Sequence, residues 1–201
     1  MTFDLMSLEM THILHQAKNY IEKLDEFLCN STNLPRCDLF KIFDRKIVLE
    51  IAYYGANYAF DAIKTDFDSK QTINNYYRLI RYFLSTGQSK LSLRYCNELK
   101  SMFDFEEIHI IDAECYWKSG DLELATERLW SFLINRARFN TTNVINAHEM
   151  LYRVLVERKN KEQIVKLIKY SQQWLPEEYE KIGYDAALVR KKIMERLLKY
   201  S

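Results

Sequence analysis

Apolar residues recur at intervals of three and four positions along most of the chain, and polar residues fill the positions between them. This spacing places the apolar side chains on one face of an α-helix. The first such run extends from residue 6 to residue 28, and the segment after it, residues 29–35, is rich in cap and turn residues. We therefore expect one amphipathic helix followed by a loop.

The same spacing continues over residues 39–67, where many of the apolar positions are aromatic. A single glycine costs a helix about 1 kcal/mol relative to alanine, so the spacing leaves open whether Gly55 lies inside one helix or separates two. Beyond residue 70 the runs are shorter and alternate with short polar turns. The pattern as a whole predicts about nine or ten helices.

Composition supports an all-α fold. The 201 residues include only 4 Gly and 2 Pro, and 48% of them are hydrophobic. So high an apolar share argues against a disordered chain, and the scarcity of Gly and Pro argues against a β-sandwich or barrel, whose many turns need both.

The chain also repeats itself. Gly120 follows Gly87 by 33 residues, and each glycine lies between two helical runs. The second of these units resembles the tetratricopeptide repeat. The small, aromatic, turn and bulky apolar positions of that family fall on Ala113, Tyr116, Gly120-Asp121, Ala125, Leu129 and Phe132.

Physical chemistry explains these residue types. Ala113 and Ala125 are small where the two helices of a hairpin cross, and Tyr116 fills the space between units. Gly120 permits the left-handed backbone of the turn, and Asp121 then caps the second helix.

A weaker third unit follows after 39 residues instead of 33, and we attribute the difference to a longer connection around residues 138–143. Its matching positions are Leu151, Tyr152, Leu155, Lys159-Asn160, Ile164, Ile168 and Pro176. A last amphipathic helix covers residues 182–197. Its basic residues, which we expect to solvate the outer face of a terminal repeat, are Arg190, Lys191, Lys192, Arg196 and Lys199.

The resemblance is best over residues 73–176 and implies an α-solenoid, a right-handed superhelix of antiparallel helix hairpins. We expect residues 71–201 to form these repeats. Residues 1–70 would form an N-terminal helical cap or a degenerate repeat, and the two parts would make one continuous domain.

In this family the first helix of each repeat lines a concave groove that binds another protein. The resemblance places five groove positions in one repeat, namely Asn74, Tyr77, Arg78, Arg81 and Leu84. It places five more in the next, namely Glu107, Ile110, Glu114, Trp117 and Lys118. The implied function is a non-enzymatic scaffold that binds a peptide or helix within a larger complex. A homodimer through the N-terminal helices is a further expectation. Tyr77 and Arg81 replace the Lys and Asn of chaperone-tail clamps, which argues against that subclass.

Charge bears on the main alternative, which is RNA binding. Residues 77–87 also resemble a pentatricopeptide hairpin, a repeat that reads RNA bases. However, the chain has 29 basic and 28 acidic residues, and Tyr77 occupies the polar base-reading position. The charge is segregated, because residues 101–135 carry eight acids and two bases, whereas residues 136–201 carry fourteen bases and eight acids. RNA binding is favoured only by the positive charges of Arg78, Arg81 and the last third of the chain.

The sequence contains no phosphate-binding glycine loop, G-x-S-x-G or H-E-x-x-H motif. His12 and His15 lie three positions apart without a third ligand, and Cys115 with His109 or His148 would be a nucleophile pair without a signature. We therefore expect no catalytic, cofactor or metal site.

The four cysteines follow no disulfide or metal spacing, which is typical of a reduced cytoplasmic or nuclear protein. The N-terminal run is interrupted by charges, unlike a signal peptide, and no window of about 18 residues is continuously apolar. We expect no membrane association.

Overall fold

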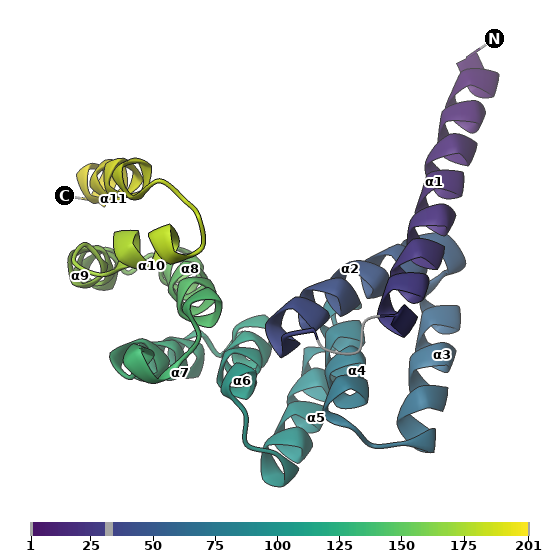
Figure 1. Ribbon diagram of the computed structural model, residues 1–201, viewed down its shortest axis with the longest axis horizontal. Coiled ribbons are helices and arrows are strands. Elements are labelled where there is room, and N and C mark those ends of the chain that lie inside the picture. Colours follow the sequence, from purple (N-terminus) through teal and green to yellow (C-terminus); the bar gives the residue numbers. More distant parts are fainter. Residues whose placement is uncertain (1, 31–33, 201) are drawn as a thin grey trace. The chain divides into compact units, whose positions relative to one another are not determined.

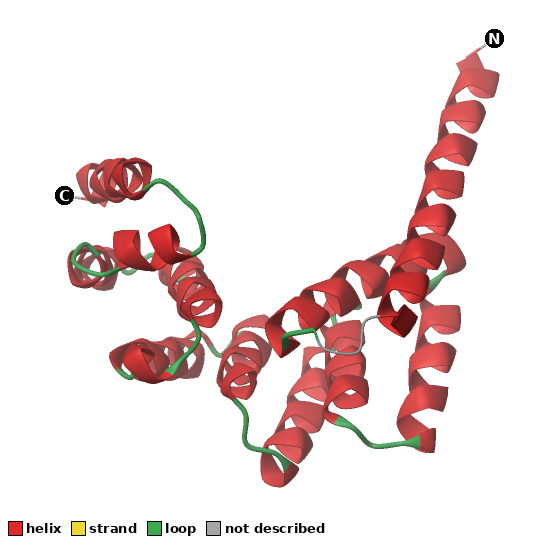
Figure 2. Ribbon diagram, viewed as in Figure 1, coloured by secondary structure: helices red, strands yellow, loops and turns green. Residues whose placement is uncertain are grey.

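The structure, a computed structural model, describes residues 2–30 and 34–200, with side chains from residue 15 onward. Within these ranges the chain folds into eleven α-helices and one short 3₁₀ helix, η1, without any strand (Figure 1, Figure 2). The all-α prediction is confirmed. The helices are α1 (Thr2–Asn30), α2 (Arg36–Tyr54), α3 (Ala56–Ser69), α4 (Ile73–Ser85), α5 (Ser89–Met102), α6 (Glu106–Lys118), α7 (Leu122–Ile134), η1 (Arg136–Arg138), α8 (Thr141–Glu157), α9 (Lys161–Ser171), α10 (Leu175–Lys181) and α11 (Ala186–Tyr200).

The contacts divide the chain into two compact units, residues 1–95 and residues 96–201, which we call unit 1 and unit 2. The division falls within α5, whereas the sequence suggested that an N-terminal cap or degenerate repeat ends at residue 70 and that the repeats begin there. Aromatic contacts account for the difference. Phe67 of α3 meets Tyr76 of α4 edge to face, with ring centroids 4.7 Å apart, so that α3 and α4 belong to the same core.

Aromatic rings fill much of the core of unit 1. Phe40 of α2 stacks on Tyr77 of α4, with ring centroids 3.7 Å apart and planes within 4° of parallel. Phe83 of α4 stacks in turn on Tyr95 of α5, at a centroid distance of 5.6 Å. Each ring buries a large apolar area, and contacts of this kind stabilise the packing beyond area burial alone.

Unit 2 has a mainly aliphatic core. Ala113 of α6 and Ala125 of α7 are fully buried, together with Leu129, Leu151 and Leu155. Small side chains let neighbouring helices approach closely. The prediction that the two alanines pack inside the helix pair is confirmed.

A residue with positive φ stands between the helices of five successive pairs. These residues are Gly55 (φ 90°), Gly87 (φ 74°), Gly120 (φ 89°), Lys159 (φ 54°) and Gly183 (φ 85°). Gly55 therefore separates two helices. This division and the short α10 explain why the described residues form eleven α-helices, whereas about nine or ten were expected. The pairs are α2/α3, α4/α5, α6/α7, α8/α9 and α10/α11. Helix pairing thus begins within the first 70 residues, where the sequence showed no recognisable repeat.

The turns of unit 2 are built as expected. The carboxylate of Asp121 accepts a hydrogen bond from the Leu124 amide at 3.0 Å, which caps α7. Asn160 caps α9 in the same way, by accepting from the Gln163 amide at 3.1 Å. Pro176 lies in the first turn of α10, after the second helix of the preceding pair has ended.

The longer connection before α8 is tightly packed. Phe139 stacks on Phe132 of α7, with centroids 4.1 Å apart. Arg136 donates to the Tyr170 hydroxyl at 2.6 Å, and its guanidinium lies 4.8 Å from the ring centroid of Trp174. The additional residues between the two pairs are therefore held by stacking and cation–π contacts.

One expectation for the last helix is wrong. Arg196 does not solvate the outer face of α11, because its guanidinium donates to both carboxylate oxygens of Glu149 on α8, each at 3.0 Å. This bidentate geometry matches the planar guanidinium fork. The other four basic residues, Arg190, Lys191, Lys192 and Lys199, are exposed as expected. Apolar residues are exposed on α11 as well, including Leu188, Met194 and Leu198, of which the last is 76% exposed.

Candidate protein-binding site

The first five predicted groove residues lie on α4 in unit 1. Tyr77 is only 4% exposed, because its ring stacks on Phe40, and its hydroxyl donates to Asp44 of α2 at 2.7 Å. Asn74 and Leu84, near the two ends of α4, are half-buried. Tyr77 therefore joins two helices of unit 1, a role that the repeat pattern did not predict.

The two arginines of α4 also make contacts within unit 1. Arg81 Nε lies 2.8 Å from the same Asp44 carboxylate, and Arg78 pairs with Asp66 of α3. The structure thus brings Tyr77, Arg78 and Arg81 together as a set of bonds from α4 to α2 and α3.

The other five predicted residues lie on α6 in unit 2. Trp117 donates from its indole nitrogen to Glu157 of α8 at 2.6 Å, and the Lys118 ammonium lies 4.2 Å from the Trp117 ring centroid. The Glu107 carboxylate accepts a hydrogen bond from the side-chain Nδ2 of Asn143 at 3.3 Å. Ile110 packs against the core, and Glu114 is half-buried. Trp117 and Glu107 consequently join α6 to α8.

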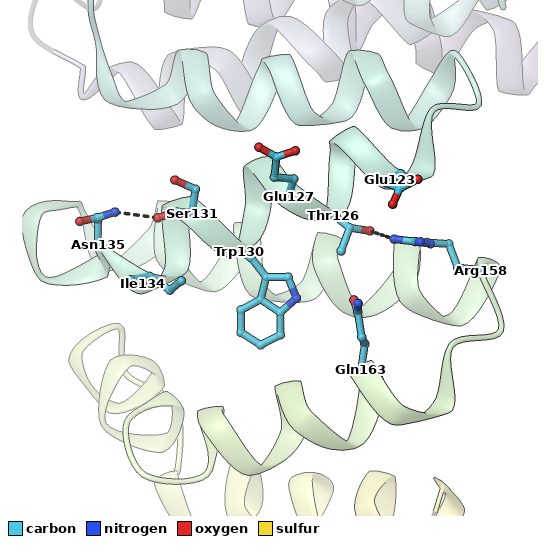
Figure 3. A pocket seen from close by; sticks show the side chains of 9 residues that line it. All are labelled: Glu123, Thr126, Glu127, Trp130, Ser131, Ile134, Asn135, Arg158 and Gln163. Carbon is cyan, nitrogen blue, oxygen red and sulfur yellow. Dashed lines mark hydrogen bonds between the residues drawn. The ribbon is translucent and has the colours of Figure 1, made fainter.

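The sequence did not reveal a cleft between α7 and α9. This cleft has a volume of about 540 Å³, and the Trp130 indole projects into the space between the two helices (Figure 3). Ile134, one turn further along α7, is 65% exposed. The lining residues are Glu123, Thr126, Glu127, Trp130, Ser131, Ile134, Asn135, Arg158 and Gln163.

Polar groups surround this apolar centre. Glu123 and Glu127 are exposed on α7, while Arg158 donates to the Thr126 hydroxyl at 3.0 Å. The side-chain oxygen of Gln163 is buried and has no hydrogen-bond partner among the described residues. An aromatic and aliphatic surface beside two carboxylates and an unused acceptor suits a protein segment with an apolar anchor and basic flanks.

The helical periodicity of α7 does contain a signal for this cleft. Trp130 and Ile134 lie four positions apart, as do Glu123 and Glu127, whereas the buried Ala125, Leu129 and Phe132 occupy the other face. Two apolar residues within the otherwise polar face of a helix are therefore the sequence pattern that indicates this cleft.

The residues considered for catalysis have other neighbours in the structure: the ring centroid of His109 lies 6.4 Å from that of Phe132, and the ring centroid of His148 lies 5.9 Å from that of Trp174. Cys115 is fully buried, and its hydrogen bond with the neighbouring Cys96, together with burial, raises the pKa of the Cys96 thiol. A buried thiol of this kind packs as a small apolar group. Among the described side chains, no three or more His, Cys, Asp and Glu residues are grouped so as to hold a metal ion. His12 lies outside the described side chains, and His15 is exposed.

Unit 2 also contains a buried carboxylate. Burial alone would raise the pKa of Glu149, but the neighbouring His148 and the Arg196 guanidinium outweigh it and hold this pKa at about 2. His148 Nδ1 lies 3.4 Å from the Glu149 carboxylate. Glu149 is therefore ionised at neutral pH and joins α8 to α11.

The chain is similar to a known protein in structure but not in sequence. No family model matches the sequence, and no curated protein matches it significantly. A tetratricopeptide repeat protein from Parabacteroides merdae ATCC 43184 is similar in structure, with a TM-score of 0.56 and 13% sequence identity. The match covers 96% of this chain and 67% of that one.

The chain has a tetratricopeptide-like fold. The resemblance inferred from the Ala113–Phe132 motif is thus confirmed at the level of architecture, and the structural match also covers the helix pairs of unit 1. No helix in the described part of the chain combines the length and the apolar character that crossing a membrane requires.

Proposed function

We propose that this tetratricopeptide-like protein is a non-catalytic scaffold that binds a peptide or helical segment of another protein within a larger complex. Stacked helix pairs hold surface side chains in fixed positions, so that the scaffold loses little conformational freedom when a partner binds. The four cysteines are free, which suits the reducing cytoplasm or nucleus.

The main support for this proposal is the cleft between α7 and α9, which we call the Trp130 cleft. Trp130 and the exposed Ile134 would receive an apolar anchor of the partner, because rigid aromatic side chains supply much of the binding energy in protein interfaces. Glu123 and Glu127 would face Lys or Arg residues beside that anchor. Gln163 would accept a hydrogen bond from a backbone or side-chain donor.

The predicted groove residues take two roles in the proposal. Trp117 and Lys118 on α6 would form an additional contact surface in unit 2, with Glu107, Ile110 and Glu114 supporting it. On α4, Asn74 and Leu84 would be accessible to a partner, whereas Tyr77, Arg78 and Arg81 would hold the helix in place.

Selection of random peptides on the whole protein tests the proposal. We expect the enriched peptides to share an apolar anchor flanked by Lys or Arg. Trp130→Ala and Ile134→Ser should each weaken them about tenfold or more, because both remove the apolar surface. Tyr184→Ala, which removes another exposed aromatic ring of unit 2 outside the cleft, is the matched control and should leave the affinity unchanged.

Two results would contradict the proposal. One is an equal loss of affinity in the cleft variants and in the control. The other is tight, salt-sensitive binding of single-stranded RNA with no peptide enriched, which would favour a nucleic-acid function.

A further inference from the structure

Unit 1 contains a cleft of a different chemical kind. It has a volume of about 520 Å³ and lies where α1 and α3 flank α2. Each helix contributes residues spaced three or four positions apart, and such residues share one helix face. The lining residues are Ile21, Glu22, Asp25, Lys46, Glu50, Tyr54, Tyr58, Asp61, Ala62, Thr65, Asp66 and Arg78.

The lining carries more negative than positive charge. Five carboxylates face two cations, and both cations are already paired. The Lys46 ammonium lies 2.6 Å from Glu50 Oε1 and 3.1 Å from Asp25, and Arg78 pairs with Asp66. Burial acts to lower the pKa of Lys46, but Glu50 and Asp25 outweigh it and raise this pKa, so that the ammonium stays charged. Glu22 and Asp61 have no cation from within the cleft, and Glu22 lies 3.8 Å from the Lys18 ammonium outside it.

Glu50 supplies the second observation. Its side chain is only 8% exposed, and while Oε1 binds Lys46, Oε2 is buried and has no hydrogen-bond partner among the described residues. A buried carboxylate oxygen without a donor is costly, because it has lost water and gained nothing in return. A donor that enters the cleft would remove that cost.

Two tyrosines add aromatic faces to the same cleft. Tyr54, on the same side of α2 as Glu50, has its ring centroid 4.6 Å from that of Tyr58 at the start of α3. Tyr58 is 55% exposed, and Asp61 follows it by one turn on the same helix. Carboxylates combined with exposed aromatic faces suit a planar, delocalised cation that stacks and donates several hydrogen bonds at once.

We propose that this cleft binds an arginine side chain of a partner protein, with the guanidinium stacked on Tyr58 and donating to Asp61 and Glu50. Arginine fits better than lysine because its guanidinium carries five donors in a plane and is more weakly hydrated than an ammonium group. The inference rests on the proposed scaffold function in that the arginine belongs to a protein segment. It concerns a different unit from the Trp130 cleft.

Fluorescence polarisation with a labelled peptide of alternating Arg and Ser, on the whole protein, tests this assignment. Two matched peptides carry citrulline, which has nearly the same shape but no charge, or lysine in place of arginine. We expect the arginine peptide to bind, the citrulline peptide to lose detectable binding, and the lysine peptide to bind about tenfold more weakly. Equal binding of the arginine and lysine peptides would overturn the assignment to arginine.

Variants locate the site. Asp61→Asn and Tyr58→Ala change exposed side chains, so the helices should stay folded, and each should weaken the arginine peptide about tenfold. Glu180→Gln removes the same charge from an exposed position of unit 2 outside both clefts and is the matched control. An equal effect of Asp61→Asn and Glu180→Gln would mean that only the overall charge attracts the peptide, which would overturn the proposal.

The two proposals fail separately. Loss of the arginine peptide in the Tyr58 and Asp61 variants, without any peptide selected on the Trp130 cleft, would support the arginine site and contradict the Trp130 site. Peptides that depend on Trp130 but no binding of the arginine peptide would give the opposite result.

Discussion

The two units build the same arrangement of helix pairs from different side chains. In unit 1, Phe40 and Tyr77 stack between α2 and α4, whereas unit 2 buries the small Ala113 and Ala125 between α6 and α7. Large rings and small residues both satisfy close packing if the neighbouring surface is complementary. The recognisable repeat pattern depends on the small residues, which is why only unit 2 showed it clearly.

The clefts of the two units differ in a similar way. The unit 1 cleft lies where α1 and α3 flank α2 and combines carboxylates with tyrosines, whereas the unit 2 cleft lies between α7 and α9 and centres on Trp130 and Ile134. The residues that line the clefts are largely separate from those that build the cores. Binding chemistry can therefore diverge between units while the architecture is retained.

Truncating one core residue in each unit should have the largest effect. Tyr77→Ala removes a stacked ring and the hydroxyl that donates to Asp44, so we expect a loss of about 4 kcal/mol in the free energy of unfolding. Leu129→Ala leaves a cavity in the aliphatic core and should cost about 3 kcal/mol. Urea unfolding followed by far-UV circular dichroism measures both.

Tyrosine-to-phenylalanine exchange provides the control for unit 1. Tyr77→Phe keeps the ring and loses only the hydrogen bond, so its cost should be about 1 kcal/mol. If Tyr77→Ala and Tyr77→Phe were equally destabilising, the hydrogen bond and not the ring would hold α4, and the contrast between the two cores would fail.

Acid should weaken unit 2 through Glu149. The pKa of Glu149 is about 2 in the folded protein against 4.5 for the free side chain, so its contribution is complete above about pH 4.5 and is lost as the pH falls towards 2. Protonation over this range should remove up to about 3 kcal/mol. Tryptophan fluorescence follows this loss in unit 2, because Trp117, Trp130 and Trp174 all lie there.

The Glu149→Gln variant tests the assignment. It should be less stable than the parent at about pH 7, and the difference should narrow at about pH 3, since the parent has then lost part of the same contribution. A difference that stays constant between these pH values would show that another group controls the acid response.

The turns should give the smallest effects, and here the two units should agree. A Cβ at Gly87 or Gly120 meets no atom within 4 Å, so alanine there is strained only by the positive φ, and we expect each variant to lose about 1 kcal/mol. Lys159→Gly should gain about 1 kcal/mol, because it relieves the same strain. Thermal unfolding measures all three, and unequal costs at Gly87 and Gly120 would mean that the turns are not equivalent.

What the sequence could predict was mostly local. Gly120 and Asp121 were assigned correctly because a positive φ and an N-cap depend on residues next to each other. Arg196 was assigned wrongly because its partner, Glu149, is 47 residues away. The positions of Tyr77 and Arg81 depend on Asp44 of α2, in a region where the sequence showed no repeat to guide the prediction.

The connection before α8 has a consequence for how such arrays diverge. Because Phe139 and Arg136 bind the additional residues to Phe132, Tyr170 and Trp174, this insertion is not a free loop whose closure must be offset elsewhere. A tandem array can then change its period at one junction without interrupting the stack. Natural variation in repeat length would accordingly accumulate at junctions where aromatic residues are available to receive the added segment.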